Sequence, residues 1–217
     1  MMWSQQAWEK VAPIYAKILT MPFNTELSNG TLPQEKFLFY LAQDAYYLLE
    51  FGRTLSTISS RMQHADLVMA FAGFSTGAIF AERSLHESYF VEFGLATNVQ
   101  PTPSTLLYTN YILNQAAYAN VEIAVAAVLP CFWIYKAVGD YIFSQQSGDQ
   151  NPYKRWIDMY AGAEFATAVE KAITIADQLA ADANTETRQK MFEAFEMATR
   201  LEWMFWDSAY QLEKWKI

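Results

Sequence analysis

Apolar side chains recur every three or four residues along almost the whole chain of 217 residues. This spacing places them on one side of an α-helix, whereas alternation of β-branched and polar residues, the pattern of a strand, is nearly absent. Hydrophobic residues make up 53% of the chain and charged residues 18%, which favours a folded protein with a sizeable core. The sequence therefore predicts an all-α fold, and residues 1–217 are expected to form a single domain.

Proline and asparagine residues mark the ends of the expected helices. Pro22 lies in a turn after the first helix, Thr31 is placed to cap a helix that contains Pro33, and Asn151 with Pro152 begins another. Helices are expected at about 4–20, 31–61, 65–93, 104–119, 121–146, 152–182 and 185–214. About seven or more helices with short connections predict a compact bundle.

Net charge, the length of the apolar runs and the cysteine count limit the partners and the compartment of the protein. Lys and Arg total 15 against 23 Asp and Glu, a net charge of −8, which does not favour nucleic-acid binding. The longest apolar run, residues 123–135, is shorter than a membrane span and is expected to be a buried core segment. A single cysteine excludes an intrachain disulfide, and residues 1–10 lack the pattern of a signal peptide. We therefore expect a cytoplasmic protein without a membrane or nucleic-acid partner.

An acidic residue interrupts an apolar stripe in the second expected helix. Asp44 lies three residues after Leu41 and four before Leu48, with Tyr40 and Tyr47 beside it. The rest of the stripe is Phe37, Phe51, Leu55 and Ile58. Burying a carboxylate costs free energy unless it is hydrogen-bonded or used. Asp44 is therefore either a structural carboxylate bonded to a hydroxyl or a ligand-facing acid.

The last helix has the same arrangement around Glu202. This residue lies between Ala198 and Phe205 in a stripe that also contains Met191, Phe195 and Ala209. A carboxylate among rings has its pKa raised, which suits proton donation near neutral pH, although a purely structural hydrogen bond is the alternative.

The only cysteine, Cys131, directly follows Pro130 in the fifth expected helix, with Tyr135 and Val138 on the same face. Proline removes a helical hydrogen bond, and the resulting bend can expose a thiol to a cavity. A lone buried cysteine is also commonly an inert small hydrophobe, and spacing does not show that Asp44, Cys131 and Glu202 meet. If they do, the thiol could add to an electron-poor ring while the carboxyls move protons.

Four blocks of sequence carry a resemblance to a known family. They are Met21-Pro22-Phe23 with 30–33 and 40–48; 129–135; Asn151-Pro152-Tyr153 with Trp156, Ile157 and Tyr160; and Glu202 with 205–207, Ala209 and Tyr210. In this order, over about residues 21–210, they resemble the TenA family, the class II thiaminases or aminopyrimidine aminohydrolases. Because Cys131 is present, the chain resembles the cysteine-containing branch.

The resemblance implies a haem-oxygenase-like helical fold, usually a homotetramer. It also implies replacement of the amine of thiamin-derived 4-amino-5-aminomethylpyrimidines by hydroxyl, with release of ammonia and hydroxymethylpyrimidine in thiamin salvage, and an associated cleavage of thiamin. Three roles carry over by motif: Cys131 as nucleophile, Glu202 as proton-transfer carboxylate, and Asp44 as the group that binds the pyrimidine amino edge and helps activate the thiol. The implied substrate-binding residues are Tyr47, Tyr108, Tyr135, Tyr160 and Phe205.

Two alternative functions fit parts of the sequence. The same fold hosts haem and di-iron proteins, and Glu82 with His86 has the spacing of half a metal site, but His64 is the only other histidine, so we expect no metal and no cofactor. A non-catalytic helical scaffold could instead bind a partner through exposed tryptophans such as Trp3, Trp203 or Trp215, although such residues more commonly close an oligomer interface.

Overall fold

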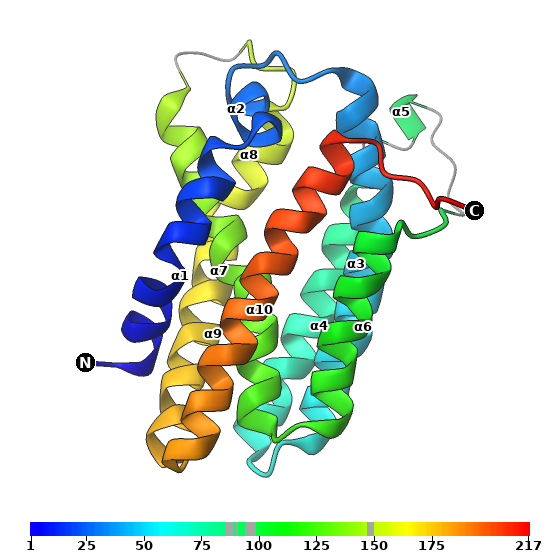
Figure 1. Ribbon diagram of the computed structural model, residues 1–217. Coiled ribbons are helices and arrows are strands. Elements are labelled where there is room, and N and C mark those ends of the chain that lie inside the picture. The colour runs from blue at the N-terminus through cyan, green and yellow to red at the C-terminus, as the bar shows by residue number, and fades with distance from the viewer. Residues whose placement is uncertain (86–88, 90, 94–98, 147–149) are drawn as a thin grey trace.

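The computed structural model describes residues 1–85, 89, 91–93, 99–146 and 150–217. The described residues form helices and contain no strand, so the predicted all-α class is confirmed. The long helices run side by side as a bundle (Figure 1). The elements are α1 (Trp3–Thr20), α2 (Pro22–Ser28), α3 (Gln34–Arg61), α4 (Ala65–Leu85), α5 (Val91–Phe93), α6 (Pro103–Tyr118), α7 (Val121–Gln145), α8 (Lys154–Ala161), α9 (Ala163–Asp182) and α10 (Thr185–Tyr210).

Helix α7 forms the centre of the core and packs against α6, α8, α9 and α10. Every residue from Ile123 to Phe132 is buried. The helix is long and apolar enough to cross a membrane, but most of its apolar segment is buried inside the bundle. The expectation of a buried core segment at 123–135 is therefore confirmed, with Trp133 half-buried at its end.

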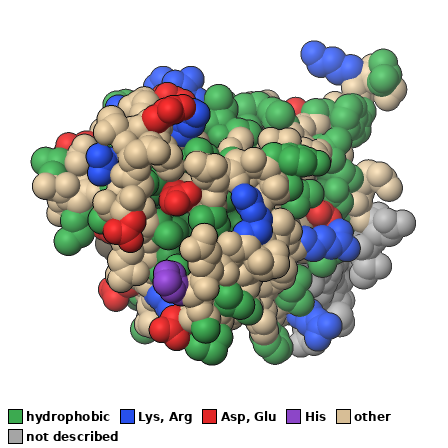
Figure 2. All heavy atoms as spheres, turned by 90° about the horizontal axis from the view of Figure 1, so that it is seen from below, with side chains coloured by type: hydrophobic (Ala, Val, Ile, Leu, Met, Phe, Trp, Pro, Cys, Tyr) green, Lys and Arg blue, Asp and Glu red, His purple; other side chains and the backbone are tan. Residues whose placement is uncertain are grey.

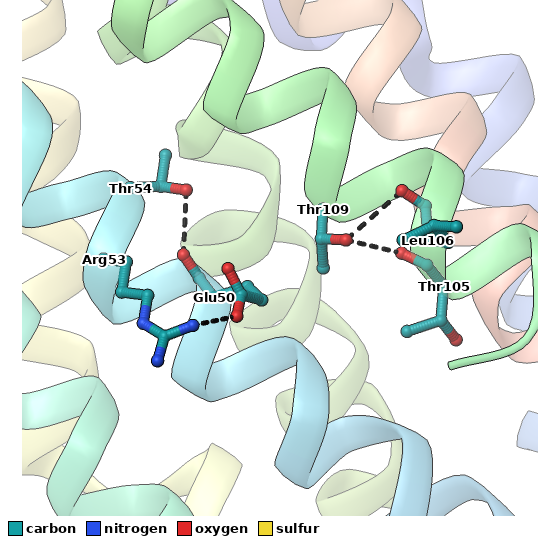
Figure 3. A network of polar contacts seen from close by, with 6 residues as sticks. All are labelled: Glu50, Arg53, Thr54, Thr105, Leu106 and Thr109. Carbon is teal, nitrogen blue, oxygen red and sulfur yellow. Dashed lines mark hydrogen bonds and ion pairs between the residues drawn. The ribbon is translucent and has the colours of Figure 1, made fainter. Parts of the chain in front are cut away.

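Helix α3 packs against α4 and α6, and both α3 and α6 bury a threonine. The Thr54 hydroxyl donates to the Glu50 carbonyl at 2.9 Å, and the Thr109 hydroxyl donates to the carbonyls of Thr105 at 3.0 Å and Leu106 at 3.2 Å (Figure 3). Each hydroxyl thus has a partner within its own helix, so it can be buried without one in the neighbouring helix.

The expected single helix at 152–182 is wrong, because the helix is interrupted at Gly162. That residue is extended (φ −64°, ψ 153°), which ends α8 and begins α9. Tyr160 lies tightly against Gly139 of α7: a Cβ at Gly139 would be 2.7 Å from the Tyr160 Cβ. This close approach fixes α8 on α7, and α9 continues in a new direction to pack along α7 (Figure 1).

Other helix ends also differ from expectation. The expected turn around Pro22 is the helix α2, with Pro22 at its first position, where a missing N–H has no cost. Pro33, not Thr31, is the N-cap of α3, and the Thr31 hydroxyl instead donates to the Glu26 carbonyl. Asn151 begins a turn by accepting from the Tyr153 N–H, so α8 starts two residues later than expected.

The last helix is shorter than expected, and part of the expected third helix at 65–93 lies outside the described residues. Helix α4 is described over Ala65–Leu85 and α5 over Val91–Phe93, and residues 86–88 and 90 between them are not described. Helix α10 ends at Tyr210 instead of 214, because Leu212 adopts a left-handed conformation with φ 51° that cannot continue a helix.

The end of the bundle seen from below carries acidic, basic, apolar and neutral polar side chains side by side (Figure 2). Charges of both signs are interspersed there, as is usual for a solvated face.

Candidate active site

The three reactive side chains singled out from the sequence all lie inside the bundle. Asp44 on α3, Cys131 on α7 and Glu202 on α10 have exposed fractions of 1%, 8% and 0%. The apolar stripes that surround Asp44 and Glu202 are buried as predicted. None of the three points to bulk solvent.

A cavity of about 680 Å³ lies between α3, α4, α7 and the α8–α9 turn. Its functional lining consists of five residues named from the sequence: Asp44, Tyr47, Cys131, Tyr135 and Tyr160. Much of the remaining wall is aromatic, from Phe51, Phe74, Phe132 and Phe165. The carboxyls of Asp158 and Glu164 also line the space. The cavity thus combines rings with a thiol, carboxyls and hydroxyls, which suits a flat polar heterocycle.

Glu202, Tyr108 and Phe205 are in contact with this lining. The Tyr108 hydroxyl donates to Glu202 Oε1 at 2.7 Å. Tyr47, which lines the cavity, packs against the other two rings, with its centroid 4.9 Å from Tyr108 and 5.5 Å from Phe205. The charge of Glu202 acts on the Cys131 thiol. The expected roles of Tyr108 and Phe205 in substrate binding stay predictions.

Three buried polar atoms of the site have no hydrogen-bond partner among the described residues: Asp44 Oδ2, Tyr47 Oη and Glu202 Oε2. Leaving such atoms unpaired in a protein interior costs on the order of 1–3 kcal/mol each. Four more such atoms occur among the described residues, on Trp3, Asn24, Tyr89 and Trp206, so it is the position of these three beside the thiol that marks the region. A ligand with polar edges would relieve the cost.

Burial raises the pKa of both carboxyls. The pKa of Asp44 is raised to about 7 by burial, an effect that the nearby Tyr40 hydroxyl partly offsets. The pKa of Glu202 is raised to about 8, again by burial, while the Tyr108 hydrogen bond lowers it and the charge of Asp44 raises it. Near neutral pH Glu202 therefore holds its proton more firmly than Asp44 does.

The Cys131 thiol is held in its neutral form. Burial raises its pKa well above the ordinary value, and the charges of Glu202 and Asp44 act in the same direction, while Tyr47 lowers it. A thiolate would therefore form only as its proton passes to a neighbouring group during reaction.

The sequence singled out neither Tyr40 nor Trp156 as a site residue. The Trp156 Nε1–H donates to Tyr40 Oη at 3.3 Å, and the Tyr40 hydroxyl donates to Tyr135 Oη at 3.4 Å. The available signal was the position of Tyr40 one helical turn before Asp44. Trp156 is on a different helix, so no spacing could place it there.

The residues of the two alternative functions have other surroundings. His64 is exposed in the turn between α3 and α4, while His86 and the Glu82 side chain lie outside the described residues. No group of three or more His, Cys, Asp or Glu side chains that could hold a metal occurs in the described part of the chain. Trp3 is buried and stacks on Phe192 at 5.4 Å, so its expected exposure is wrong. Trp203 is half-buried and Trp215 is exposed.

The TENA/THI-4/PQQC family matches residues 8–212 of the sequence. The chain belongs to this family. The resemblance to TenA that four separate sequence blocks indicated is thereby confirmed.

Relatives within the family carry names from thiamin metabolism. The thiamine biosynthesis multifunctional protein ThiED of Corynebacterium efficiens is 32% identical over 95% of this chain, which spans only 28% of that larger protein. The aminopyrimidine aminohydrolase of Halalkalibacterium halodurans is 29% identical, over 99% of this chain and 98% of its own length.

Solved structures agree with the fold. A TenA homologue from P. horikoshii OT3 superposes with a TM-score of 0.88 at 26% identity, over 97% of this chain and 99% of that one. A domain of unknown function from Shewanella denitrificans, described as having a heme oxygenase-like fold, superposes with a TM-score of 0.78 at 15% identity, over 96% of this chain and 92% of that one. The predicted haem-oxygenase-like bundle is confirmed.

Proposed function

We propose that this protein is an aminopyrimidine aminohydrolase of the TenA type. It replaces the amine of a thiamin-derived 4-amino-5-aminomethylpyrimidine by hydroxyl, releasing ammonia and hydroxymethylpyrimidine for thiamin salvage, and cleavage of thiamin is an associated activity. The observation that carries the proposal is the set of unpartnered buried atoms of Asp44, Tyr47 and Glu202 around the thiol-bearing aromatic cavity. The name of the H. halodurans relative, which this chain matches over nearly its whole length, supports the same activity.

The first half of the reaction removes the amine. The Cys131 sulfur adds to an electron-poor ring carbon as its proton passes to the Asp44 carboxylate. The electron pair that enters the ring expels the exocyclic amine, which takes the proton of Glu202 and leaves as ammonia. An exocyclic methylene remains on the ring. A raised pKa suits Glu202 to this step, because the group still holds its proton near neutral pH.

The second half restores the enzyme. Water adds to the exocyclic methylene and gives one proton to the Glu202 carboxylate. The ring electrons return to expel the sulfur, which regains a proton from Asp44. The sum is one water consumed and one ammonia released. Rings on both sides of the cavity limit access of other water to the intermediate.

Binding of the pyrimidine uses the remaining polar groups. The 4-amino group donates to Asp44, whose Oδ2 has no other partner among the described residues. Tyr47, Tyr135 and Tyr160 surround the ring and thiol, while Tyr108 and Phe205 support Glu202 and Tyr47. No metal or cofactor takes part in these steps.

Ammonia release from 4-amino-5-aminomethyl-2-methylpyrimidine tests the proposal. The wild-type protein should release ammonia, and Cys131→Ser should lower kcat by at least about 100-fold, because a hydroxyl is a much weaker nucleophile. Pyrimidine binding and thermal unfolding serve as controls and should change little, since serine is nearly isosteric. Wild-type turnover in Cys131→Ser would exclude the nucleophile.

We further propose that residues 1–217 form one domain and that the protein is a cytoplasmic homotetramer without a nucleic-acid or membrane partner. The exposed side of α4 supports assembly: no charged residue occurs between Leu67 and Ala81, yet Val68, Met69 and Phe80 are exposed. Light scattering should give about four times the chain mass of 24.9 kDa. A monomer mass would contradict the tetramer.

A further inference from the structure

The tail that follows α10 binds the first turn of α6. The Ser104 N–H donates to Glu213 Oε2 at 2.9 Å, and the Ser104 hydroxyl donates to Glu213 Oε1 at 3.0 Å. Ser104 is the second residue of α6, a position whose N–H has no partner within the helix. A carboxylate there also interacts favourably with the helix dipole. Both oxygens of Glu213 thus hold one residue at the start of α6.

The tail reaches α6 because α10 ends in a tight turn. Leu212 adopts a φ of 51°, and the Glu213 N–H donates to the Ser208 carbonyl at 2.9 Å. Further along the tail, the Trp215 Nε1–H donates to the Pro101 carbonyl at 3.0 Å. The tail therefore contacts both the linker before α6 and the first turn of that helix.

Helix α3 holds the same linker through the buried side chain of Gln43. Its Nε2 donates to the Gln100 carbonyl at 3.1 Å, and its Oε1 accepts from the Thr102 N–H at 2.9 Å. Thr102 is the N-cap of α6, and its hydroxyl accepts from the Thr105 N–H at 3.2 Å. The start of α6 is thus fixed by α3 and by the tail of α10.

One helical turn after Ser104, α6 carries Tyr108, whose hydroxyl donates to Glu202 of α10 at 2.7 Å. We propose that Glu213 is a positioning residue, which fixes the first turn of α6 and thereby holds the Tyr108 hydroxyl on Glu202. Ser104 and Tyr108 are four residues apart, so they lie on the same face of α6, and both are buried. A displacement of the first turn therefore moves Tyr108. The assignment rests on the proposed function only in giving Glu202 its task.

Other titratable groups around Glu202 come from α3 and α7. They are Asp44 and Tyr47 of α3, and Cys131 and Tyr135 of α7. Burial raises the pKa of both tyrosines and of the thiol well above their ordinary values, so these three groups stay neutral near pH 8. Asp44 titrates close to Glu202, so it is replaced by Asn in the background used for the test.

The test is a pH titration of the Glu202 carboxyl by ¹³C NMR in protein labelled at glutamate, with Glu202→Gln to assign the signal. In the Asp44→Asn background, Tyr108→Phe should move the titration to higher pH by about 1 unit, because one hydrogen bond to the charged form is lost. Glu213→Ala should move it in the same direction by ~0.3–0.5 unit, since Gln43 still holds the linker. Glu213→Gln keeps one acceptor oxygen and should move it by less. Glu213→Ala added to Tyr108→Phe should cause no further shift.

Asp177→Ala is the matched control. Asp177 accepts from the N–H and the hydroxyl of Ser4, at 2.8 Å and 2.7 Å, and Ser4 is the second residue of α1, as Ser104 is of α6. Helix α1 carries no residue of the proposed active site. Asp177→Ala should therefore lower the urea midpoint about as much as Glu213→Ala does, because each loses the same pair of hydrogen bonds, but it should leave the Glu202 titration unchanged.

The pH dependence of activity gives a second readout. In protein with Asp44 intact, the basic limb of kcat/KM should move to higher pH in Glu213→Ala and stay in place in Asp177→Ala. A merely structural role of Glu213 would lower stability without moving this limb.

A Glu202 titration that stays in place in Glu213→Ala, or that shifts equally in Asp177→Ala, would overturn the assignment. The NMR titration needs no substrate, so it decides on Glu213 even if the wild-type protein releases no ammonia, a result that would contradict only the proposed function.

Discussion

The protonation state of Glu202 is set at the scale of single residues. Burial favours its neutral form and the Tyr108 hydroxyl, 2.7 Å from Oε1, favours the charged one; burial prevails, with a pKa of about 8. Above this pH the free enzyme loses the proton that we propose is given to the leaving amine, so kcat/KM should fall through a basic limb near pH 8.

Glu202→Gln tests this role. Glutamine keeps the size and the hydrogen bond from Tyr108 but cannot donate an acidic proton. We expect kcat to fall by about 10²–10⁴-fold and the limb near pH 8 to disappear, as measured by the pH dependence of ammonia release. Glu196→Gln, an acid on the other side of α10, is the control and should keep both the rate and the limb. A mutant with the wild-type pH profile would contradict the proton-transfer role.

At the scale of single residues, the sequence predicted best which side chains are buried. Asp44 and Glu202 each interrupt a stripe with helical spacing, and that pattern alone places them inside. It could not show that Tyr108 donates to Glu202 or that Tyr47 packs against Tyr108, because these contacts join α3, α6 and α10. Their roles came from the family resemblance, which does not specify which ring lines the cavity.

At the scale of elements, the contact between α7 and α8 positions Tyr160 on the cavity wall. Gly139 makes it possible, since a Cβ there would meet Tyr160 Cβ at 2.7 Å and its carbonyl carbon at 2.9 Å. Neither atom can move without moving α8. The glycine is thus required by the close approach of two helices.

Gly139→Ala should therefore push α8 away from α7. We expect a loss of about 1–3 kcal/mol in the free energy of unfolding, measured by urea denaturation, together with weaker pyrimidine binding. The higher helix propensity of alanine would by itself stabilise α7, so the sign of the change separates the two effects. Ser144→Ala, on the exposed side of the same helix, should lose much less stability. A more stable Gly139→Ala protein with normal binding would contradict the tight contact.

Helix positions were largely predictable, and helix ends less so. The long periodic segments of α3, α7 and α10 were predicted close to their observed bounds, because their stripes are strong. The break at Gly162 was missed because the apolar spacing continues across it, and the close Tyr160 contact that requires it is tertiary. Helix α2 differs from the expected turn because Pro22, which cannot continue α1, occupies the first position of a new helix.

At the scale of the whole molecule, two buried carboxyls with raised pKa values link stability to pH. Between about pH 4 and pH 8 the folded state holds protons on Asp44 and Glu202 that the unfolded state releases. The folded state therefore binds more protons, and the free energy of unfolding falls as pH rises through this window, by roughly 1.4 kcal/mol per pH unit for each carboxyl at most.

The double variant Asp44→Asn, Glu202→Gln should remove this dependence. The wild type should lose stability from pH 5 to pH 8, and the double variant should not. The stability of the variant relative to the wild type should therefore be higher at pH 8 than at pH 5, by on the order of a few kcal/mol, as measured from urea midpoints at both pH values. Glu186→Gln, which removes an exposed carboxyl paired with Lys190, is the control and should not gain stability in this way. Parallel pH dependences in the wild type and the double variant would argue against buried ionisable groups.

A crystal structure with 4-amino-5-hydroxymethyl-2-methylpyrimidine bound tests the central claim most directly. The pyrimidine ring should lie in the aromatic cavity against the Cys131 sulfur, with its 4-amino group donating to Asp44 and its hydroxymethyl group directed toward Glu202. Electron density for the pyrimidine outside this cavity, or within it but out of reach of the sulfur and both carboxyls, would contradict the claim.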